Sequence, residues 1–138
     1  MKIYVGGAID DTSIERVRQV QAHVARCGHK ITFDWTTHKI DPHASETWRK
    51  QELAHMELAG VERADILIAL YPDGRGLSME IGYKMGKMLS NEQLPNGKPP
   101  IWVVDPKRPA LFYSLHCIKV VDWDDLAKEI ENLPDLER

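Results

Sequence analysis

The sequence is poor in the features that mark secreted, membrane-spanning and disulfide-rich proteins. It has two cysteines, Cys27 and Cys117, too few for a disulfide framework and typical of a protein with reduced thiols. The N-terminus lacks the basic start and apolar core of a signal peptide. No apolar run approaches the roughly 18 residues that a transmembrane helix needs. We therefore expect a cytoplasmic protein without a membrane span.

Excess positive charge and metal-binding patterns are lacking too. The formal net charge is −3, and the lysines and arginines are scattered instead of forming the basic stripe that contacts nucleic-acid phosphates. The six histidines include no i, i+4 pair and no cysteine partner at ligand spacing. We expect no nucleic-acid partner, no metal and no other cofactor.

The glycine-rich fingerprints of nucleotide binding are absent as well. Gly74 and Gly76 have no third glycine at the spacing of a dinucleotide fingerprint, and no Gly-Lys-Ser/Thr motif is present. Several acidic residues without a phosphate cradle are typical of sugar chemistry rather than phosphoryl transfer.

The clearest positive signal is the apolar stretch 66–72, which a Pro-Asp-Gly turn ends. It is too short for an ordinary helix and predicts a strand buried on both faces. A helix then starts near Gly76, where Ser78 can cap free backbone amides. Glu80 would lie in the first turns, beside the carboxyl end of the strand, where open α/β sheets bind ligands. Acidic residues also favour a first helical turn on electrostatic grounds alone, so a structural role for Glu80 stays open.

Strands and helices alternate along the rest of the chain. We predict strands at 2–7, 29–35, 66–72, 100–104 and 117–121. Helices are predicted to follow, with Trp48, Leu53 and Met56 facing inward on the one that opens at 45–47. This alternation predicts a single α/β domain over residues 1–138. Its expected architecture is a flavodoxin/Rossmann-like three-layer sandwich with a five-stranded, mainly parallel sheet.

The carboxyl ends of such strands meet at one crevice. We predict that it is lined by substrate-binding residues from several strand ends. These are Gly6, Gly7, Asp34, Trp35, Asp73, Gly76 and Ser78. Trp35 flanks an irregular segment, 36–45, and is either a core residue or a surface for a base.

Short motifs spread over almost the whole chain carry a resemblance. They are Tyr4 within KIYVGGAI, Ala64-Asp65-Ile66, GLSMEIGY at 76–83, Ser114-Leu115-His116 and Asp122-Trp123-Asp124. In this order they resemble the nucleoside 2-deoxyribosyltransferases and the related nucleotide N-glycosidases. The resemblance implies that Glu80 attacks the anomeric carbon, displaces the base and holds a glycosyl-enzyme ester until another base or water takes the sugar.

The resemblance also assigns partners to Glu80. Tyr4 is expected to donate a hydrogen bond to its carboxylate, and this bond and the helix N-terminus favour the ionised form that a nucleophile needs. Glu57 matches a second acid, usually an aspartate in the family. It holds a sugar hydroxyl, serves in acid–base catalysis or is a solvated helix residue. Asp73 is a looser candidate on the base side, and Asp65 anchors its strand.

The substrate's 5′ end separates the two enzyme classes. The N-glycosidases hold a 5′-phosphate with Ser and Arg in the first turn, where this sequence has Asp10 and Asp11, which would repel a phosphate. We expect a deoxyribosyltransferase of nucleoside salvage that acts on 2′-deoxynucleosides. The alternatives are a 5′-monophosphate N-glycosidase, with Arg75 or Arg108 as the phosphate contact, and a non-catalytic nucleoside-binding module.

A homo-oligomer is implied by the same resemblance. In it a neighbouring subunit completes each active site through the region around Ser114, although the asparagine often found just before this motif is absent here. The apolar residues 111–113 are more apolar surface than a monomer's loop would normally expose. We expect a closed oligomer, at least a dimer.

Overall fold

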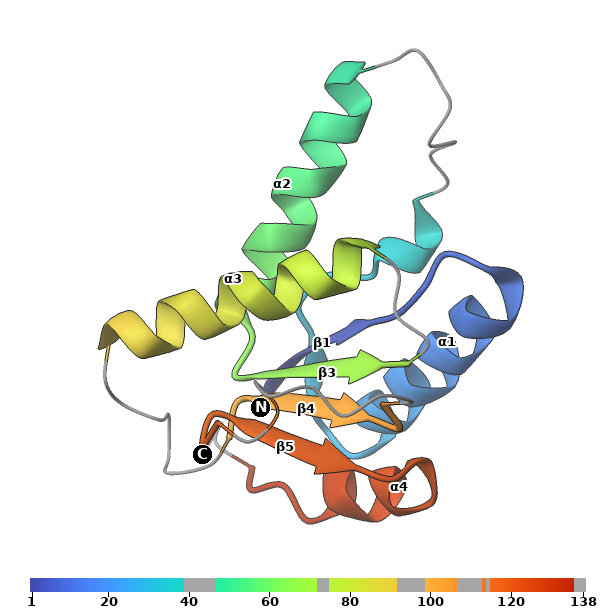
Figure 1. Cartoon of the computed structure of the whole chain (residues 1–138). Coiled ribbons are helices and arrows are strands. Elements are labelled where there is room, and N and C mark those ends of the chain that lie inside the picture. Colours follow the sequence, from blue (N-terminus) through green and yellow to red (C-terminus); the bar gives the residue numbers. More distant parts are fainter. Residues whose placement is uncertain (39–46, 72–74, 92–98, 107–112, 114, 136–138) are drawn as a thin grey trace.

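A five-stranded parallel sheet forms the centre of the computed structural model, which describes residues 1–38, 47–71, 75–91, 99–106, 113 and 115–135 (Figure 1). The strands are β1 (Lys2–Gly6), β2 (Lys30–Ile31), β3 (Ile66–Leu70), β4 (Ile101–Val104) and β5 (Ile118–Val121). Their order is β2-β1-β3-β4-β5, and each neighbouring pair is parallel. The predicted α/β class and parallel sheet are confirmed.

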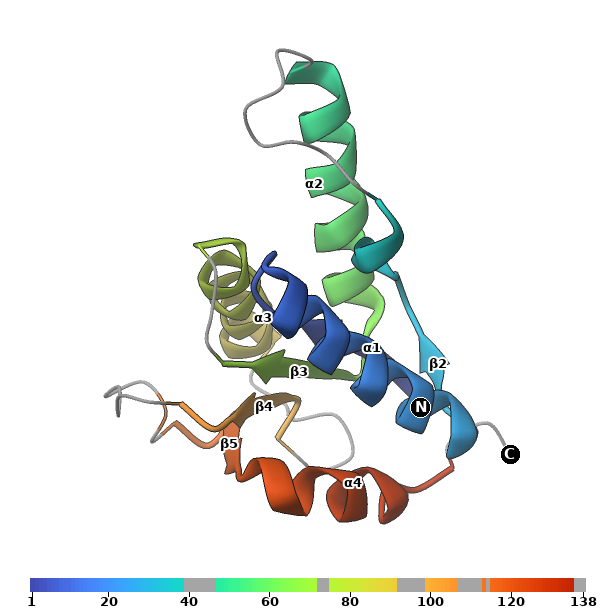
Figure 2. The same cartoon turned by 90° about the vertical axis from the view of Figure 1, so that its right-hand side faces the viewer.

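Helices cover both faces of the sheet. They are α1 (Asp11–Arg26), α2 (Thr47–Arg63), α3 (Arg75–Asn91) and α4 (Trp123–Glu131), with a 3₁₀ turn, η1 (Trp35–Thr37). Helices α1 and α4 contact each other on one face, and α2 and α3 contact each other on the other (Figures 1 and 2). Within the described residues no helix is both long and apolar enough to cross a membrane.

The central strand β3 is buried along its whole length. Because β3 is covered on both faces, it appears in the sequence as an unbroken apolar run instead of an alternating pattern. The strand order reverses direction between β1 and β3, since α1 leads away to β2 on one side and the later strands add on the other. The carboxyl ends of β1 and β3 are therefore the topological switch point, where this class of fold binds ligands.

Helix α1 is specified at both ends by local chemistry. The Asp10 carboxylate caps its N-terminus by accepting the amide of Ser13 at 2.9 Å, and Gly28 follows its end with a φ of 84°, a conformation that favours glycine. Val17, Val20 and Val24 lie one turn apart and are buried against the sheet.

The prediction of a strand over 29–35 is wrong beyond its first half. Strand β2 ends at Ile31, although the amide of Thr32 still bonds to the carbonyl of Ile3. The chain then turns because Asp34 accepts the amide and the hydroxyl of Thr36, at 3.0 and 2.5 Å. A short polar side chain that bonds to its own backbone competes with a sheet ladder in this way.

The predicted inward face of α2 is also partly wrong. Trp48 is 61% exposed and Met56 is 38% exposed, whereas Gly60 and Val61 near the helix end are buried. The reason is visible in Figures 1 and 2, where the N-terminal turns of α2 project beyond the sheet and the other helices. Only the C-terminal part of α2 packs on the body of the molecule.

Candidate active site

Glu80 and Tyr4 meet at the carboxyl edge of β1. Helix α3 begins at Arg75, so Glu80 lies in its second turn. The Tyr4 hydroxyl donates a hydrogen bond of 3.1 Å to Oε1 of Glu80. The tyrosine is fully buried and the glutamate is only 8% exposed. Residues 76 positions apart thus form one buried pair beside the switch point.

Gly6 allows α3 to approach the strand this closely. A Cβ atom at Gly6 would lie 3.0 Å from Oε2 of Glu80 and 2.6 Å from Cδ1 of Leu77. At Gly7 a Cβ atom would lie 2.8 Å from Cγ2 of Val17 on the other helix layer. The sequence predicted that both glycines contact substrate. In the structure their lack of a side chain allows α3 and α1 to pack closely against the end of β1.

Helix α2 brings Glu57 to the same pair. Gly60, one turn after Glu57, lies against β1, where an added Cβ atom would be 3.1 Å from the Tyr4 ring and 2.7 Å from Cβ of Phe33. Glu57 itself is half-buried, and its carboxylate interacts electrostatically with both Tyr4 and Glu80. The structure thus brings together the three residues proposed from the sequence as catalytic.

Burial dominates the protonation of this cluster. The pKa of Glu80 is raised to about 8, first by burial and then by the charge of Glu57, while the hydrogen bond from Tyr4 lowers it. Burial also raises the pKa of Glu57 and that of Tyr4. Burial thus opposes the ionised form of Glu80 that the sequence led us to expect at neutral pH, whereas the hydrogen bond from Tyr4 favours that form as expected. Neighbouring acids with raised pKa values are typical of catalytic clefts.

Two further candidates, Asp34 and Trp35, bond to the fold itself. Besides its bonds to Thr36, Asp34 accepts the side-chain amide of Gln21 at 3.1 Å. Trp35 is 8% exposed, and its indole nitrogen donates to the carbonyl of Val5 at 2.8 Å. These contacts hold η1 against α1 and β1, so Trp35 occupies the core position that the sequence left as one of two readings.

The remaining candidates are placed less closely. Gly76 and Ser78 lie in the first turns of α3, and Ser78 is exposed and inside the helix, so it is not the N-cap that its sequence position suggested. Asp73 and Ser114 lie outside the described residues. Asp65 accepts the backbone amide of Lys2 at 2.8 Å, the anchoring role predicted for it.

Sequence reasoning missed a cluster next to the switch point. Arg16 of α1 donates to the carbonyl of Tyr71 at 2.7 Å, and its guanidinium lies 4.4 Å from the ring centroid of Trp123. The Tyr71 hydroxyl bonds to that of Tyr113. Tyr71 follows β3 directly, and this strand-end position and the place of Trp123 in the Asp122-Trp123-Asp124 motif were the available signals.

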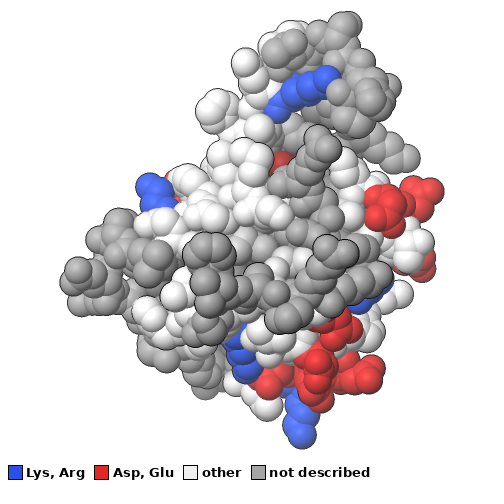
Figure 3. All heavy atoms as spheres, in the orientation of Figure 1, with Lys and Arg blue, Asp and Glu red and all other residues white. Residues whose placement is uncertain are grey.

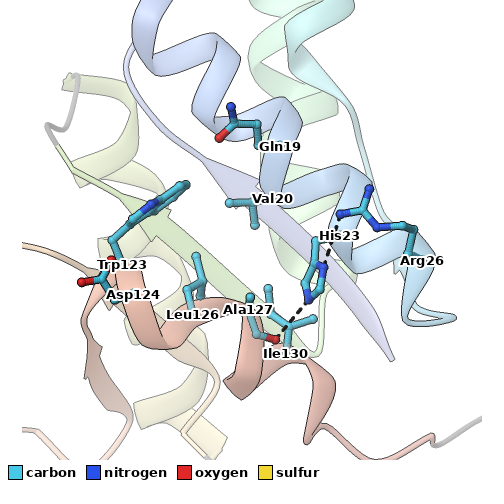
Figure 4. Close-up of a pocket in the computed structure, with 9 residues that line it drawn as sticks. All are labelled: Gln19, Val20, His23, Arg26, Trp123, Asp124, Leu126, Ala127 and Ile130. Carbon is cyan, nitrogen blue, oxygen red and sulfur yellow. Dashed lines mark hydrogen bonds between the residues drawn. The ribbon is translucent and has the colours of Figure 1, made fainter.

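A groove lined by described residues lies elsewhere, between α1 and α4 (Figure 4). It has a volume of about 360 Å³ and an apolar floor that includes Val20, Leu126 and Ile130, with His23 and Trp123 at its sides. None of the predicted site residues lines it. Glu80 belongs to α3, on the opposite face of the sheet. The candidate active site is therefore identified by its titratable groups and not by this groove.

Charge is unevenly distributed over the face shown in Figure 3. Described acidic side chains gather along one side of it, whereas the described lysines and arginines are scattered. The first turn of α4 contributes Asp124 and Asp125 to the acidic residues of the chain. Among the described residues, no three His, Cys, Asp or Glu side chains are grouped so that they could hold a metal ion.

Similarity to known proteins is detected in three dimensions. No protein-family model matches the sequence, and comparison with curated proteins finds no match. A 2-deoxyribosyltransferase from the psychrotolerant bacterium Bacillus psychrosaccharolyticus superposes with a TM-score of 0.65 at 16% identity, covering 97% of this chain and 93% of that one. The chain has the nucleoside deoxyribosyltransferase fold. A CMP N-glycosidase from Clostridium botulinum shares this fold, with a TM-score of 0.58, 12% identity and coverage of 95% and 96%.

Proposed function

We propose that this protein cleaves the N-glycosidic bond of 2′-deoxynucleosides and transfers the deoxyribosyl group to another nucleobase or to water. The observation that carries the proposal is the buried Tyr4–Glu80 hydrogen bond at the switch point, with Glu57 beside it. A pocket that only binds a nucleoside needs no buried carboxyl group with a second acid beside it, because burying a carboxylate is costly. The deoxyribosyltransferase fold is consistent with this assignment.

The proposed reaction has two displacements. An oxygen of Glu80 forms a bond to C1′ while the C1′–N bond breaks, and the electron pair of that bond leaves with the base, which takes up a proton. The acceptor base or water then attacks C1′, gives up a proton and releases Glu80. Carboxylates near C1′ stabilise the oxocarbenium character of both transition states.

Glu57 is proposed to carry the proton. The pKa of Glu80 is raised to about 8, and the charge of Glu57 contributes to this rise. A proton that passes from Glu80 to Glu57 leaves the nucleophile ionised and places an acid near the departing base. One proton then serves both requirements of the first displacement.

The N-terminus of α1 supports a substrate with an uncharged 5′ end. The Asp10 carboxylate accepts the amide and the hydroxyl of Ser13, at 2.9 and 2.8 Å, and these bonds lower its pKa. A helix N-terminus next to a switch point is where a substrate phosphate usually binds, and here the protein's own anion is bound there. Asp11 adds a second negative charge.

A 5′-monophosphate N-glycosidase is the second candidate. Arg16 favours it, because its guanidinium is held beside the end of β3 by the carbonyl of Tyr71, at the same edge of the sheet as Glu80. The similar structure of a CMP N-glycosidase agrees with such a substrate. Of the arginines named from the sequence, Arg108 lies outside the described residues.

Purified protein incubated with a panel of 2′-deoxynucleosides and their 5′-monophosphates tests both candidates. Release or exchange of bases is followed by chromatography, with and without a free acceptor base. We expect a higher kcat/KM for the nucleosides than for the 5′-monophosphates. Asp10→Asn should reduce this preference, because it removes a negative charge. A preference for monophosphates that Arg16→Gln removes would select the second candidate, and no turnover of any compound would refute both.

We also propose that the active protein is a homo-oligomer whose subunits complete one another's sites. Exposed apolar side chains lie on the two helices that carry the acids, with Met79 on α3 at 75% exposure and Met56 and Trp48 on α2. Light scattering measures the assembly at assay concentration. Mixing inactive Glu80→Ala protein with an inactive Ser114→Ala variant should restore activity through hybrid sites, and a fully active monomer would contradict the proposal.

A further inference from the structure

Lys84 is a buried charged side chain to which the proposed chemistry gives no part. It lies on α3 and is only 7% exposed. Its Nζ donates hydrogen bonds to the carbonyl of Val61, at 3.2 Å, and to that of Ala64. Val61 is in the last turn of α2 and Ala64 follows the helix. One ammonium group therefore joins α3 to the C-terminal carbonyls of α2.

These bonds lie one helical turn from the two acids. Val61 comes four residues after Glu57 on α2, and Lys84 comes four residues after Glu80 on α3. Side chains four residues apart lie on the same face of a helix. The same faces of α2 and α3 thus meet twice, once through the electrostatic interaction of Glu57 with Glu80 and once through the hydrogen bonds of Lys84.

Simple packing does not account for a lysine at this position. Burial lowers its pKa, which the carboxylates of Asp65 and Glu62 partly oppose, and an apolar side chain of similar volume would avoid that cost. What the ammonium adds is a directed link, because a cation at a helix C-terminus is attracted by the unpaired carbonyls and by the helix dipole.

Further hydrogen bonds and an ion pair of α2 also lie at its C-terminal end. Its first turns project from the body, Trp48 and Met56 are exposed, and its buried residues among those described are Gly60 and Val61. A small rotation at that end would displace Glu57 relative to Glu80. The link at Val61 and Ala64 therefore acts close to the pivot of the helix.

We infer that Lys84 is a positioning residue, which fixes α3 on the end of α2 and so sets the separation of the Glu57 and Glu80 carboxyl groups. The kinetic consequence rests on the proposed function of Glu80. The effect of that separation on the titration of Glu80 can be measured without a substrate.

Lys87 provides a matched control on the same two helices. It lies one turn after Lys84, is exposed, and forms an ion pair with Glu62 of α2 at 3.4 Å. Exposed ion pairs contribute little to structure. Lys87→Met therefore removes a positive charge and a link between α2 and α3 while leaving the buried link intact.

The test is titration of the Glu80 carboxyl carbon by ¹³C NMR, assigned with Glu80→Gln, in the wild type, Lys84→Met and Lys87→Met. The groups facing this carboxyl are Tyr4 and Glu57. If the two acids separate and water enters in Lys84→Met, the pKa of Glu80 falls from about 8 in that variant. We expect the pKa to stay unchanged in Lys87→Met and to return to the wild-type value in Lys84→Arg. Loss of a nearby positive charge alone would raise the pKa of Glu80 instead.

An unchanged or upward titration in folded Lys84→Met overturns the inference. If that variant does not fold, Lys84→Gln is titrated in its place. The glutamine side chain reaches less far toward the carbonyls, so the pKa of Glu80 should fall in this variant too. An unchanged pKa in Lys84→Gln would also overturn the inference. In activity, we expect kcat of Lys84→Met to fall about tenfold to a hundredfold with a smaller change in KM. Wild-type protein without turnover would count against the proposed function and leave the titration result standing.

Discussion

The two faces of the sheet are covered in different ways. On one face α1 buries Val17, Val20 and Val24 in the core and is capped by its own Asp10. On the other face α2 leaves Trp48 exposed and α3 buries the polar Glu80 and Lys84. The polar side chains that α1 buries, Ser13 and Gln21, are uncharged, whereas α3 buries ionisable ones and so departs further from the ordinary rule of apolar inside and polar outside. Such local departures are expected where a fold carries function.

The two layers also respond oppositely to pH. Because Glu80 has its pKa raised from 4.5 to about 8, the folded state binds a proton that the unfolded state lacks between those values. The free energy of unfolding then falls as the pH rises through this window, by at most about 1.4 kcal/mol per pH unit. Asp10 has its pKa lowered below 3.8. Its stabilisation is present at neutral pH and is lost as the pH falls through the folded pKa.

The largest effect expected is that of Glu80→Gln. Loss of the nucleophile should reduce turnover at least about a thousandfold, while removal of a buried ionisable group should raise the melting temperature at pH 8 and leave it nearly unchanged at pH 4. Turnover assays and thermal denaturation at both pH values measure this. Near wild-type turnover would mean that the α2–α3 layer is not the catalytic one.

Val24→Ala, in the α1 layer, should lower stability without lowering turnover, the opposite of Glu80→Gln. Val24 is fully buried, so its truncation should lower the free energy of unfolding by about 2 kcal/mol through lost burial and a small cavity. At a temperature where the variant remains folded, kcat should equal that of the wild type. Urea unfolding and steady-state kinetics separate the two quantities, and a fall in kcat of similar size to that of a site variant would erase the contrast between the layers.

Much of the sheet could be predicted from sequence because buried strands are encoded locally. The run that forms β3 is apolar throughout, and its carboxyl end pointed to Glu80. Strand β2 could not be delimited, since the turn depends on how Asp34 bonds to Thr36. The period of α2 showed which residues share a face. It carried no information on what covers that face, so Trp48 and Met56 were placed wrongly.

The contact between Tyr4 and Glu80 was anticipated, but the raised pKa of Glu80 was not. The contact was expected from the family resemblance. The pKa depends on how completely α2 and α3 exclude water and on the approach of Glu57, which no local pattern contains. Lys84 was missed for the same reason, because its partners are backbone carbonyls that have no sequence signature.

Glu57→Gln tests the coupling within the α2–α3 layer. Burial is the first cause of the raised Glu80 pKa and the charge of Glu57 is the second, so removal of that charge should lower the pKa only in part. In a pH profile of kcat/KM, the limb that reports ionisation of the free enzyme's nucleophile should move to lower pH. The maximum rate should also fall if Glu57 carries the proton, and an unmoved limb would mean that the two carboxyl groups titrate independently.

Tyr4→Phe should have the smallest effect and the opposite sign. The hydrogen bond from Tyr4 is the one influence that lowers the pKa of Glu80, so its removal should move the same limb to higher pH, while the rate at high pH falls by a few-fold, as the loss of a hydrogen bond worth about 1 kcal/mol predicts. Tyr83→Phe is the matched control, because its hydroxyl also donates to a glutamate, Glu62 at 3.2 Å, but between α3 and α2 at the surface. If both variants keep the wild-type profile, Tyr4 serves only to fill the core beside Gly60, and the buried pair at the end of β1 is not what sets the nucleophile's charge.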